Sequence, residues 1–326
     1  MKAVASAPAK VILFGEHFVV YDKLAIVMAI DLHVHVTATK RSDDLIQIKS
    51  DLGYVGQFQG NNYKPESGGV EGRRILEPMK LAAEAVLDRL ENNLGVNLSI
   101  DSKIPMAVGL GSSGACAVAT VAATSSLFGV DLTIEKLSQL PSKAEEYVHI
   151  KPSGIDQTIS TYGGVIKYRR SEGITPLKIE SDVPLVIGNT GKLRNTGQLV
   201  KKVRDKRERF PVLMDSIINL GDILSEKAEE ALKQGYMIRL GELMDINQGL
   251  LSAIDVSTGQ LEELIFASRM AGALGAKLTG AGGGGCIIAL SSKENQDSLV
   301  KAINKVGGTA IIARKTDSGV RVVKFE

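Results

Sequence analysis

The sequence predicts two domains, each built from both β-strands and α-helices. Its 326 residues are enough for two hydrophobic cores of ordinary size. The first half alternates short apolar strands with amphipathic or fully apolar helices. The composition changes after about residue 180, and a charged, largely helical stretch then occupies residues 196–250. We therefore place the two domains at residues 1–180 and 181–326.

The elements of the first domain are predicted from periodicity. Residues 11–14 are an apolar run that ends at Gly15, and residues 32–38 alternate apolar with polar side chains, so both are expected to be strands. Residues 50–72 contain six glycines and one proline, which favours a surface loop or lid. An amphipathic helix over 75–93, a strand over 96–100 and a buried apolar helix over 115–128 are expected next.

The remaining elements are predicted in the same way. Pro141 ends one helix, and Ser142 begins a new one with capping-box spacing to Glu145. A strand is expected over 183–188, helices over 196–250, and strands with a helix near 293–305 over 276–326.

Composition excludes several classes of protein. A 44% share of hydrophobic residues excludes a wholly disordered chain, and a net charge of +2 argues against a protein that lives by binding polyanions. Two cysteines, Cys116 and Cys286, do not make a disulfide framework. The beginning of the chain lacks the apolar run of a signal peptide, and glycines interrupt the uncharged stretch 104–130, so no membrane span is expected. We predict a cytoplasmic protein.

The central motif is a glycine- and serine-rich loop between a strand and the apolar helix. Glycines let the backbone approach phosphate oxygens, and the free N–H groups of a helix start point at the anion. The local alternative is a tight turn into a core helix. The predicted phosphate loop comprises Pro105, Met106, Ala107, Val108, Gly109, Leu110, Gly111, Ser112, Ser113, Gly114 and Ala115.

Two better-known signatures match this loop only in part. Its glycines satisfy the dinucleotide fingerprint, but Asp131, at about the right distance, follows a helix rather than a strand. The spacing also begins a P-loop, but Ala115 and Cys116 stand where lysine and serine or threonine are required. By itself the loop indicates phosphate and no more.

Two further motifs flank this one. Residues 8–17 read Pro-Ala-Lys-Val-Ile-Leu-Phe-Gly-Glu-His, and residues 277–286 read Lys-Leu-Thr-Gly-Ala-Gly-Gly-Gly-Gly-Cys. Together and in this order, the three motifs resemble the superfamily of galactokinase, homoserine kinase, mevalonate kinase and phosphomevalonate kinase, the GHMP kinases. The first motif and residues 152–156, Pro-Ser-Gly-Ile-Asp, are most similar to mevalonate kinases.

The resemblance implies a fold and an activity. The fold is two α+β domains, the first with a left-handed β-α-β unit and the second ferredoxin-like, with the active site between them. The activity is ATP-dependent phosphorylation of mevalonate at its 5-hydroxyl, in isoprenoid synthesis, with Mg²⁺. A sibling kinase acting on phosphomevalonate, homoserine or galactose is the nearer alternative, and a homodimer is left open as the assembly state.

The resemblance also assigns chemistry to single residues. Asp156 would accept the proton of the substrate hydroxyl, and Lys10 would hold that carboxylate ionised. Ser113 and Glu145 would bind Mg²⁺. Each has a local alternative: Asp156 as the end of a Ser153 helix cap, Lys10 as an exposed strand-edge lysine, and Glu145 as part of a capping box, with Glu146 as its rival.

A third set of residues would meet the acceptor. Arg194 would pair with a carboxylate, which an arginine fork suits. Thr196 would orient Asp156, or else cap the following helix. The other members of the predicted substrate site are Lys10, Glu16, His17 and Gly282.

The distant alternative is a non-catalytic nucleic-acid module. Residues 201–209 contain six basic and two acidic residues. Because acids interrupt the run and no aromatic residues interleave, a solvated helical face is the favoured interpretation, and no nucleic-acid partner is expected.

Overall fold

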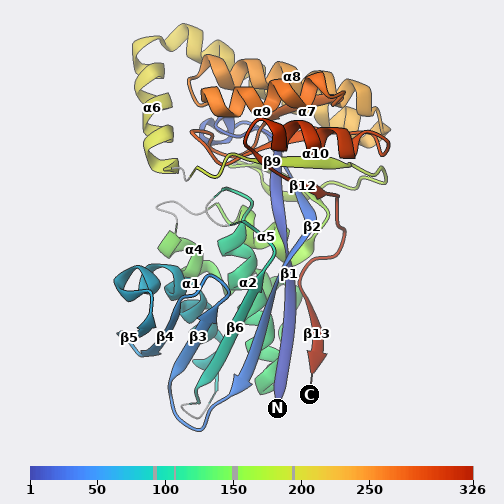
Figure 1. The fold of residues 1–326 in the computed structure, drawn as a ribbon. Coiled ribbons are helices and arrows are strands. Elements are labelled where there is room, and N and C mark those ends of the chain that lie inside the picture. Colours follow the sequence, from blue (N-terminus) through green and yellow to red (C-terminus); the bar gives the residue numbers. More distant parts are fainter. Residues whose placement is uncertain (91–93, 106–107, 149–152, 193–194, 326) are drawn as a thin grey trace.

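The computed structural model describes residues 1–90, 94–105, 108–148, 153–192 and 195–325. Two sheets, each with its own helices, lie one above the other (Figure 1). The strands of the lower sheet run in the order β13-β1-β2-β6-β3-β4-β5, with β7 on β2 and β8 on β7. Their bounds are β1 (Lys2–Phe14), β2 (Ala25–Lys40), β3 (Ile46–Ser50), β4 (Val55–Gln59), β5 (Asn62–Ser67), β6 (Val96–Ser102), β7 (Val165–Arg169), β8 (Gly173–Pro176) and β13 (Arg321–Phe325).

Helices of the first half cover this sheet. The apolar helix α2 packs on β1 and β2, and α1 packs on α2. Most side chains of α2 are buried, as predicted from its composition. Among the described residues, no helix is long and apolar enough to cross a membrane. The helices are η1 (Phe18–Tyr21), α1 (Gly69–Leu87), α2 (Ser112–Phe128), α3 (Ile134–Gln139), α4 (Ser142–Val148) and α5 (Ile155–Tyr162).

The upper sheet is wholly antiparallel, in the order β10-β11-β9-β12. The β-α-β-β-α-β succession with this strand order is ferredoxin-like, so the predicted class of two α+β domains is confirmed. Its strands are β9 (Leu185–Asn189), β10 (Gly275–Leu278), β11 (Cys286–Leu290) and β12 (Thr309–Ala313). Its helices are α6 (Thr196–Arg209), α7 (Pro211–Gln234), α8 (Met237–Ala253), α9 (Gly259–Met270) and α10 (Gln296–Lys305).

The surface loop expected over residues 50–72 is wrong, because β4 and β5 form an antiparallel hairpin there. Phe58 is buried, and its ring centroid lies 4.8 Å from that of Tyr63 on the paired strand. Gly53 and Gly60 occupy turns at the ends of β4, where positive φ angles favour glycine. The glycines therefore mark the ends of strands rather than a structureless segment.

The two sheets are joined by strands that are longer than predicted. β1 and β2 pair antiparallel from Lys2 opposite Thr39 to Phe14 opposite Ile26, and their upper ends reach the second sheet (Figure 1). After β12 the chain returns to the first sheet, where β13 pairs with β1. The parallel pair in the first sheet is β3 with β6, and the chain between them runs through β4, β5 and α1. The left hand of the β-α-β unit stays a prediction.

Candidate active site

The centre of the site is an ion pair between β1 and the first turn of α5. The Nζ atom of Lys10 lies 3.1 Å from Oδ1 of Asp156, and the two side chains are 7% and 18% exposed. Ser153 was the alternative cap for this helix; the N-cap is Gly154, and the hydroxyl of Ser153 accepts the N–H of Ile155 at 3.4 Å. Lys10 is thus not an exposed strand-edge lysine, since it is buried with a carboxylate partner.

The glycine-rich loop wraps this pair closely. The N–H of Lys10 donates to the carbonyl of Leu110 at 2.9 Å. Gly111 has a φ of +74°, and a Cβ atom there would lie 2.7 Å from Cγ of Lys10. A Cβ atom at Gly114 would lie 2.9 Å from Cβ of Asp156. Only residues without a side chain let the loop lie this near the pair.

The loop also begins helix α2 as predicted. Gly111 is the N-cap and Ser112 the first helical residue, so N–H groups at the start of α2 lie beside Lys10 and Asp156. Val108 and Leu110 are buried and anchor the loop in the core of the first domain. Met106 and Ala107 lie outside the described residues.

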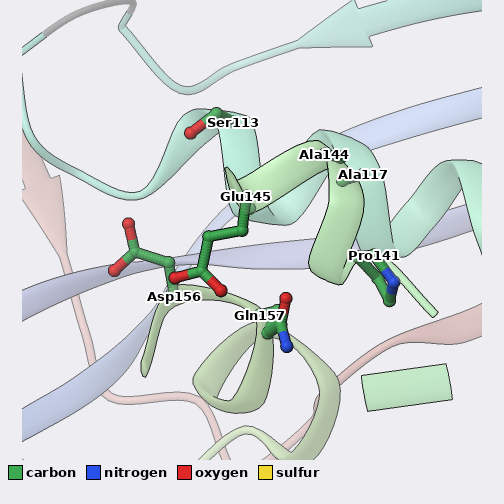
Figure 2. Close-up of a pocket in the computed structure, with 8 residues that line it drawn as sticks. Ser113, Ala117, Pro141, Ala144, Glu145, Asp156 and Gln157 are labelled. Carbon is green, nitrogen blue, oxygen red and sulfur yellow. The ribbon is translucent and has the colours of Figure 1, made fainter. Parts of the chain in front are cut away.

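Ser113, Glu145 and Asp156 line one small cavity. Figure 2 shows Glu145 extending from α4 toward Asp156 and Gln157 of α5, with Ser113 of α2 above them. The cavity has a volume of about 10 Å³, which is room for one water-sized particle. Three separate helices thus bring together the two residues predicted to bind metal and the predicted base.

Glu145 is buried, and its carboxylate accepts a hydrogen bond from the N–H of Gly154 at 3.3 Å. Burial, followed by the negative charge of Asp156, raises the pKa of Glu145 to about 7. Ser142 lies inside α4 and donates to the carbonyl of Gln139, so the capping box predicted for Glu145 does not form. The rival Glu146 is exposed.

The cavity suits a divalent cation that carries bound phosphate. Mg²⁺ is usually held by one or two carboxylates together with phosphate oxygens and water. Two carboxylates close together in a buried site favour binding of a cation, and the raised pKa of Glu145 reflects its burial first and then repulsion from Asp156. No cluster of three or more histidine, cysteine or acidic side chains suited to a metal occurs in the described ranges.

Glu16 and His17 lie where the two domains meet. The Glu16 carboxylate pairs with Lys277 of β10 and accepts a hydrogen bond from Nδ2 of Asn247 at 3.2 Å. Nε2 of His17 lies 2.8 Å from the carbonyl of Ala281. Glu16 therefore lies in the domain interface, and its predicted contact with the acceptor stays a prediction.

The third motif packs chiefly within the second domain. Gly282 and Gly283 have positive φ angles, and the N–H of Gly283 donates to the carbonyl of Val256 at 2.8 Å. Thr279 reaches the first domain through hydrogen bonds with both the N–H and the carbonyl of Ile12. Contact of this motif with the phosphate loop and a substrate role for Gly282 stay predictions.

The remaining predicted substrate residues are Arg194 and Thr196. Arg194 falls outside the described residues. Thr196 is exposed and is the first residue of α6, whose N-cap is Asn195. The interpretation of Thr196 as the cap is wrong by one position, because the side chain of Asn195 accepts the N–H of Gln198.

Sequence reasoning did not single out α8, although it links two motifs. Asn247 donates to Glu16, and the neighbouring Gln248 accepts the N–H of Leu278 at 3.0 Å. The available signal was a lysine, Lys277, among apolar neighbours: a charge in such a run needs a partner elsewhere in the fold.

The basic run on α6 is largely engaged with acids. Lys202 and Lys206 both pair with Asp255, and Arg207 pairs with Asp215. These ion pairs support the solvated-face interpretation of residues 201–209.

Comparisons with known proteins agree with this fold. The model of the GHMP kinases N terminal domain matches residues 77–164, and that of the GHMP kinases C terminal domain matches residues 228–309. A mevalonate kinase of Thermococcus sibiricus is 43% identical over 99% of this chain and 98% of its own, and one of Pyrococcus abyssi is 41% identical over 98% and 97%. The crystal structure of L. major mevalonate kinase in complex with R-mevalonate has a TM-score of 0.83 at 30% identity, covering 96% of both chains. That of Methanococcus jannaschii mevalonate kinase has a TM-score of 0.83 at 29% identity, covering 96% of this chain and 98% of its own.

The contact between Gly111 and Lys10 leads to a stability prediction. Alanine at positive φ costs roughly 1–2 kcal/mol, and crowding of the Lys10 stem adds about 1–3 kcal/mol. Gly111→Ala should therefore lower the free energy of unfolding, measured by urea denaturation, by more than Gly129→Ala does. Gly129, at the other end of α2, is the control because its φ is +70° and nothing lies within 4 Å of a Cβ atom there. Equal losses of unfolding free energy in the two variants would mean that glycine is needed at position 111 only for its positive φ angle and not for the contact with Lys10.

Proposed function

The chain belongs to the GHMP kinase family, and from this premise we propose that it transfers the γ-phosphoryl group of ATP to the 5-hydroxyl of (R)-mevalonate. The observation that carries the proposal is the Lys10–Asp156 pair lying against the glycine-rich start of α2. Phosphoryl transfer needs an anion cradle and a group that orients the attacking hydroxyl, and here the two are neighbours.

In this proposal Asp156 accepts the proton of the attacking hydroxyl. Lys10, 3.1 Å away, favours the ionised carboxylate and stabilises the negative charge that develops on the oxygen. The N–H groups at the start of α2, together with Ser112, bind phosphate oxygens of ATP. The product is 5-phosphomevalonate, an intermediate of isoprenoid synthesis.

We assign Mg²⁺ to Glu145 and Ser113. The cation supplies charge neutralisation for the phosphates of bound ATP. Glu145 is the acid chosen because it is buried beside Asp156, whereas Glu146 is exposed.

Mevalonate is the proposed acceptor because the relatives that match nearly the whole chain are mevalonate kinases. Its carboxylate needs a cation away from the phosphate loop, and the family resemblance assigns this role to Arg194. His17 at the domain interface, and Gly282 next to its contact Ala281, are the other residues proposed to meet the acceptor.

A substrate panel tests the proposal directly. Initial rates with ATP and Mg²⁺ should be highest, by kcat/KM, for (R)-mevalonate among mevalonate, phosphomevalonate, homoserine and galactose. The same preparation without an acceptor is the control for ATP hydrolysis. A higher kcat/KM for any other member of the panel would move the chain to a sibling activity.

Asp156→Asn should leave the fold intact and lower kcat by about 100-fold or more, because an amide does not accept the proton. Steady-state kinetics at saturating ATP and mevalonate measure this loss. Asp88→Asn, an exposed carboxylate at the end of α1, is the matched control and should leave kcat unchanged. If Asp156→Asn stays within a few-fold of the parent, Asp156 is not the base.

Glu145→Gln should raise the Mg²⁺ concentration for half-maximal rate by about 10- to 100-fold, the value of a charge-assisted contact. Glu146→Gln, one residue away and exposed, should change it much less. Rates measured against total Mg²⁺ at saturating ATP give this comparison. An equal or larger response from Glu146→Gln would reassign the metal ligand.

A further inference from the structure

A second ion pair, between Glu16 and Lys277, lies at the junction of the two domains. Both side chains are 0% exposed. Glu16 follows the end of β1, and Lys277 belongs to β10, 261 residues away in sequence. The pair therefore joins the first and third motifs, which the sequence presents as separate.

Each member of the pair is held by a further contact. Asn247 of α8 donates to Oε2 of Glu16 at 3.2 Å, and Nζ of Lys277 donates to the carbonyl of Leu278 at 2.7 Å. Burial raises the pKa of Glu16 and lowers that of Lys277, while their mutual attraction opposes both shifts. The pair thus carries a large desolvation cost, which its mutual attraction and hydrogen bonds offset.

The same junction contains a second set of cross-domain bonds. The hydroxyl of Thr279 accepts the N–H of Ile12 at 3.0 Å and donates to the carbonyl of Ile12 at 2.9 Å. Ile12 lies two residues after Lys10 on β1. The position of Lys10 relative to the second domain is therefore set over a short, hydrogen-bonded stretch of strand.

Other ion pairs also cross between the domains, but they are more exposed. Lys167 of β7 lies 3.0 Å from Glu229 of α7, with side chains 32% and 13% exposed. A pair of this kind can add stability without fixing a motif. At a fully buried site, a pair of apolar residues would stabilise the fold as well as an ion pair does. The buried Glu16–Lys277 pair therefore points to a role in orienting the two motifs that it joins.

We propose that Glu16 and Lys277 are positioning residues that hold the first and third motifs in one fixed arrangement, so that Lys10 and Asp156 face an acceptor bound against the second domain. The expected effect on kinetics rests on the proposed kinase function. The fixed arrangement of the two motifs rests on the geometry alone. Glu16 thereby acts through the domain junction instead of touching substrate.

The test uses Glu16→Gln, Lys277→Met and the double variant. Misplacement of reacting groups by about 1 Å can cost 100-fold in rate, so each single variant should lower kcat by about 10- to 100-fold. KM for the acceptor should rise more than KM for ATP, because the phosphate loop lies within the first domain. The double variant should lose no more than the worse single variant, since both remove one shared interaction.

Lys167→Met is the matched control, because it breaks a cross-domain pair away from the two motifs. Its kcat should stay within about twofold of the parent. Asn247→Leu removes the hydrogen bond to Glu16 and leaves the Glu16–Lys277 ion pair in place. This variant therefore replaces the single charge variants in the test if those fail to fold. It should lower kcat in the same direction by a smaller factor.

A distance measurement separates this proposal from the kinase function. Spin labels at Lys64→Cys in β5 and Lys301→Cys in α10 lie on exposed positions of the two domains, while both native cysteines are buried. Burial also raises the pKa of Cys116 to about 12, which suppresses its labelling. Lys277→Met should widen the distance distribution, and Lys167→Met should not.

Unchanged kinetics in a folded Lys277→Met protein, additive losses in the double variant, or a fall in kcat with an unchanged distance distribution would each overturn the proposal. If the parent phosphorylates no member of the substrate panel, the kinase function fails. A widened distribution in Lys277→Met would then still support the positioning role, and an unchanged one would overturn it.

Discussion

A lysine buried beside the phosphate loop requires a negative partner, and much of the site's arrangement follows from that requirement. Lys10 lies on β1, in the core sheet of the first domain, where an unpaired ammonium group would be costly. Asp156 meets it from the first turn of α5, which brings that helix against the start of α2. The glycines of the loop then become necessary, because side chains at Gly111 and Gly114 would occupy the space that the pair fills.

The same strand connects this pair to the second domain. β1 carries Lys10 in one sheet and ends next to β10, with Ile12 and Glu16 bonded to Thr279 and Lys277. A change at the junction would therefore be transmitted to Lys10 through a few residues of rigid strand. Closely packed interiors transmit such displacements instead of absorbing them.

Local sequence patterns predicted well those helices and strands whose structure depends mainly on their own residues. The apolar helix α2, the helix α10 and the strand β9 lie close to their predicted places, because periodicity and glycine placement are local signals. The β4–β5 hairpin was missed because the glycine content was interpreted as a surface loop or lid, whereas Phe58 and Tyr63 pack together across the pair. Strand ends were also underestimated, since the extent of β1 depends on β2 and β13 as partners.

The candidate site shows the same division. The motifs, with the family resemblance, named Lys10, Ser113, Glu145 and Asp156 before their proximity was known. They did not reveal that Glu16 pairs with Lys277 or that Asn247 joins them, because those contacts span more than 200 residues of sequence. Pairing of this kind depends on how the two folded domains pack against each other, and no local sequence pattern identifies the partner residues.

Three buried or half-buried carboxylates in this protein differ in what neutralises them. Glu16 has Lys277 and Asp156 has Lys10, so in each case the chain itself supplies the cation. Glu145 accepts a hydrogen bond from a backbone N–H and feels the charge of Lys10, but Lys10 is paired with Asp156, and burial together with the charge of Asp156 raises the pKa of Glu145 to about 7. A buried carboxylate that forms no ion pair with a described lysine or arginine is the one suited to bind a cation that the chain does not supply. In the proposed function, the difference between a structural carboxylate and a cation-binding carboxylate thus follows from where the lysines lie, and it distinguishes Glu145 from Glu16 although both are buried.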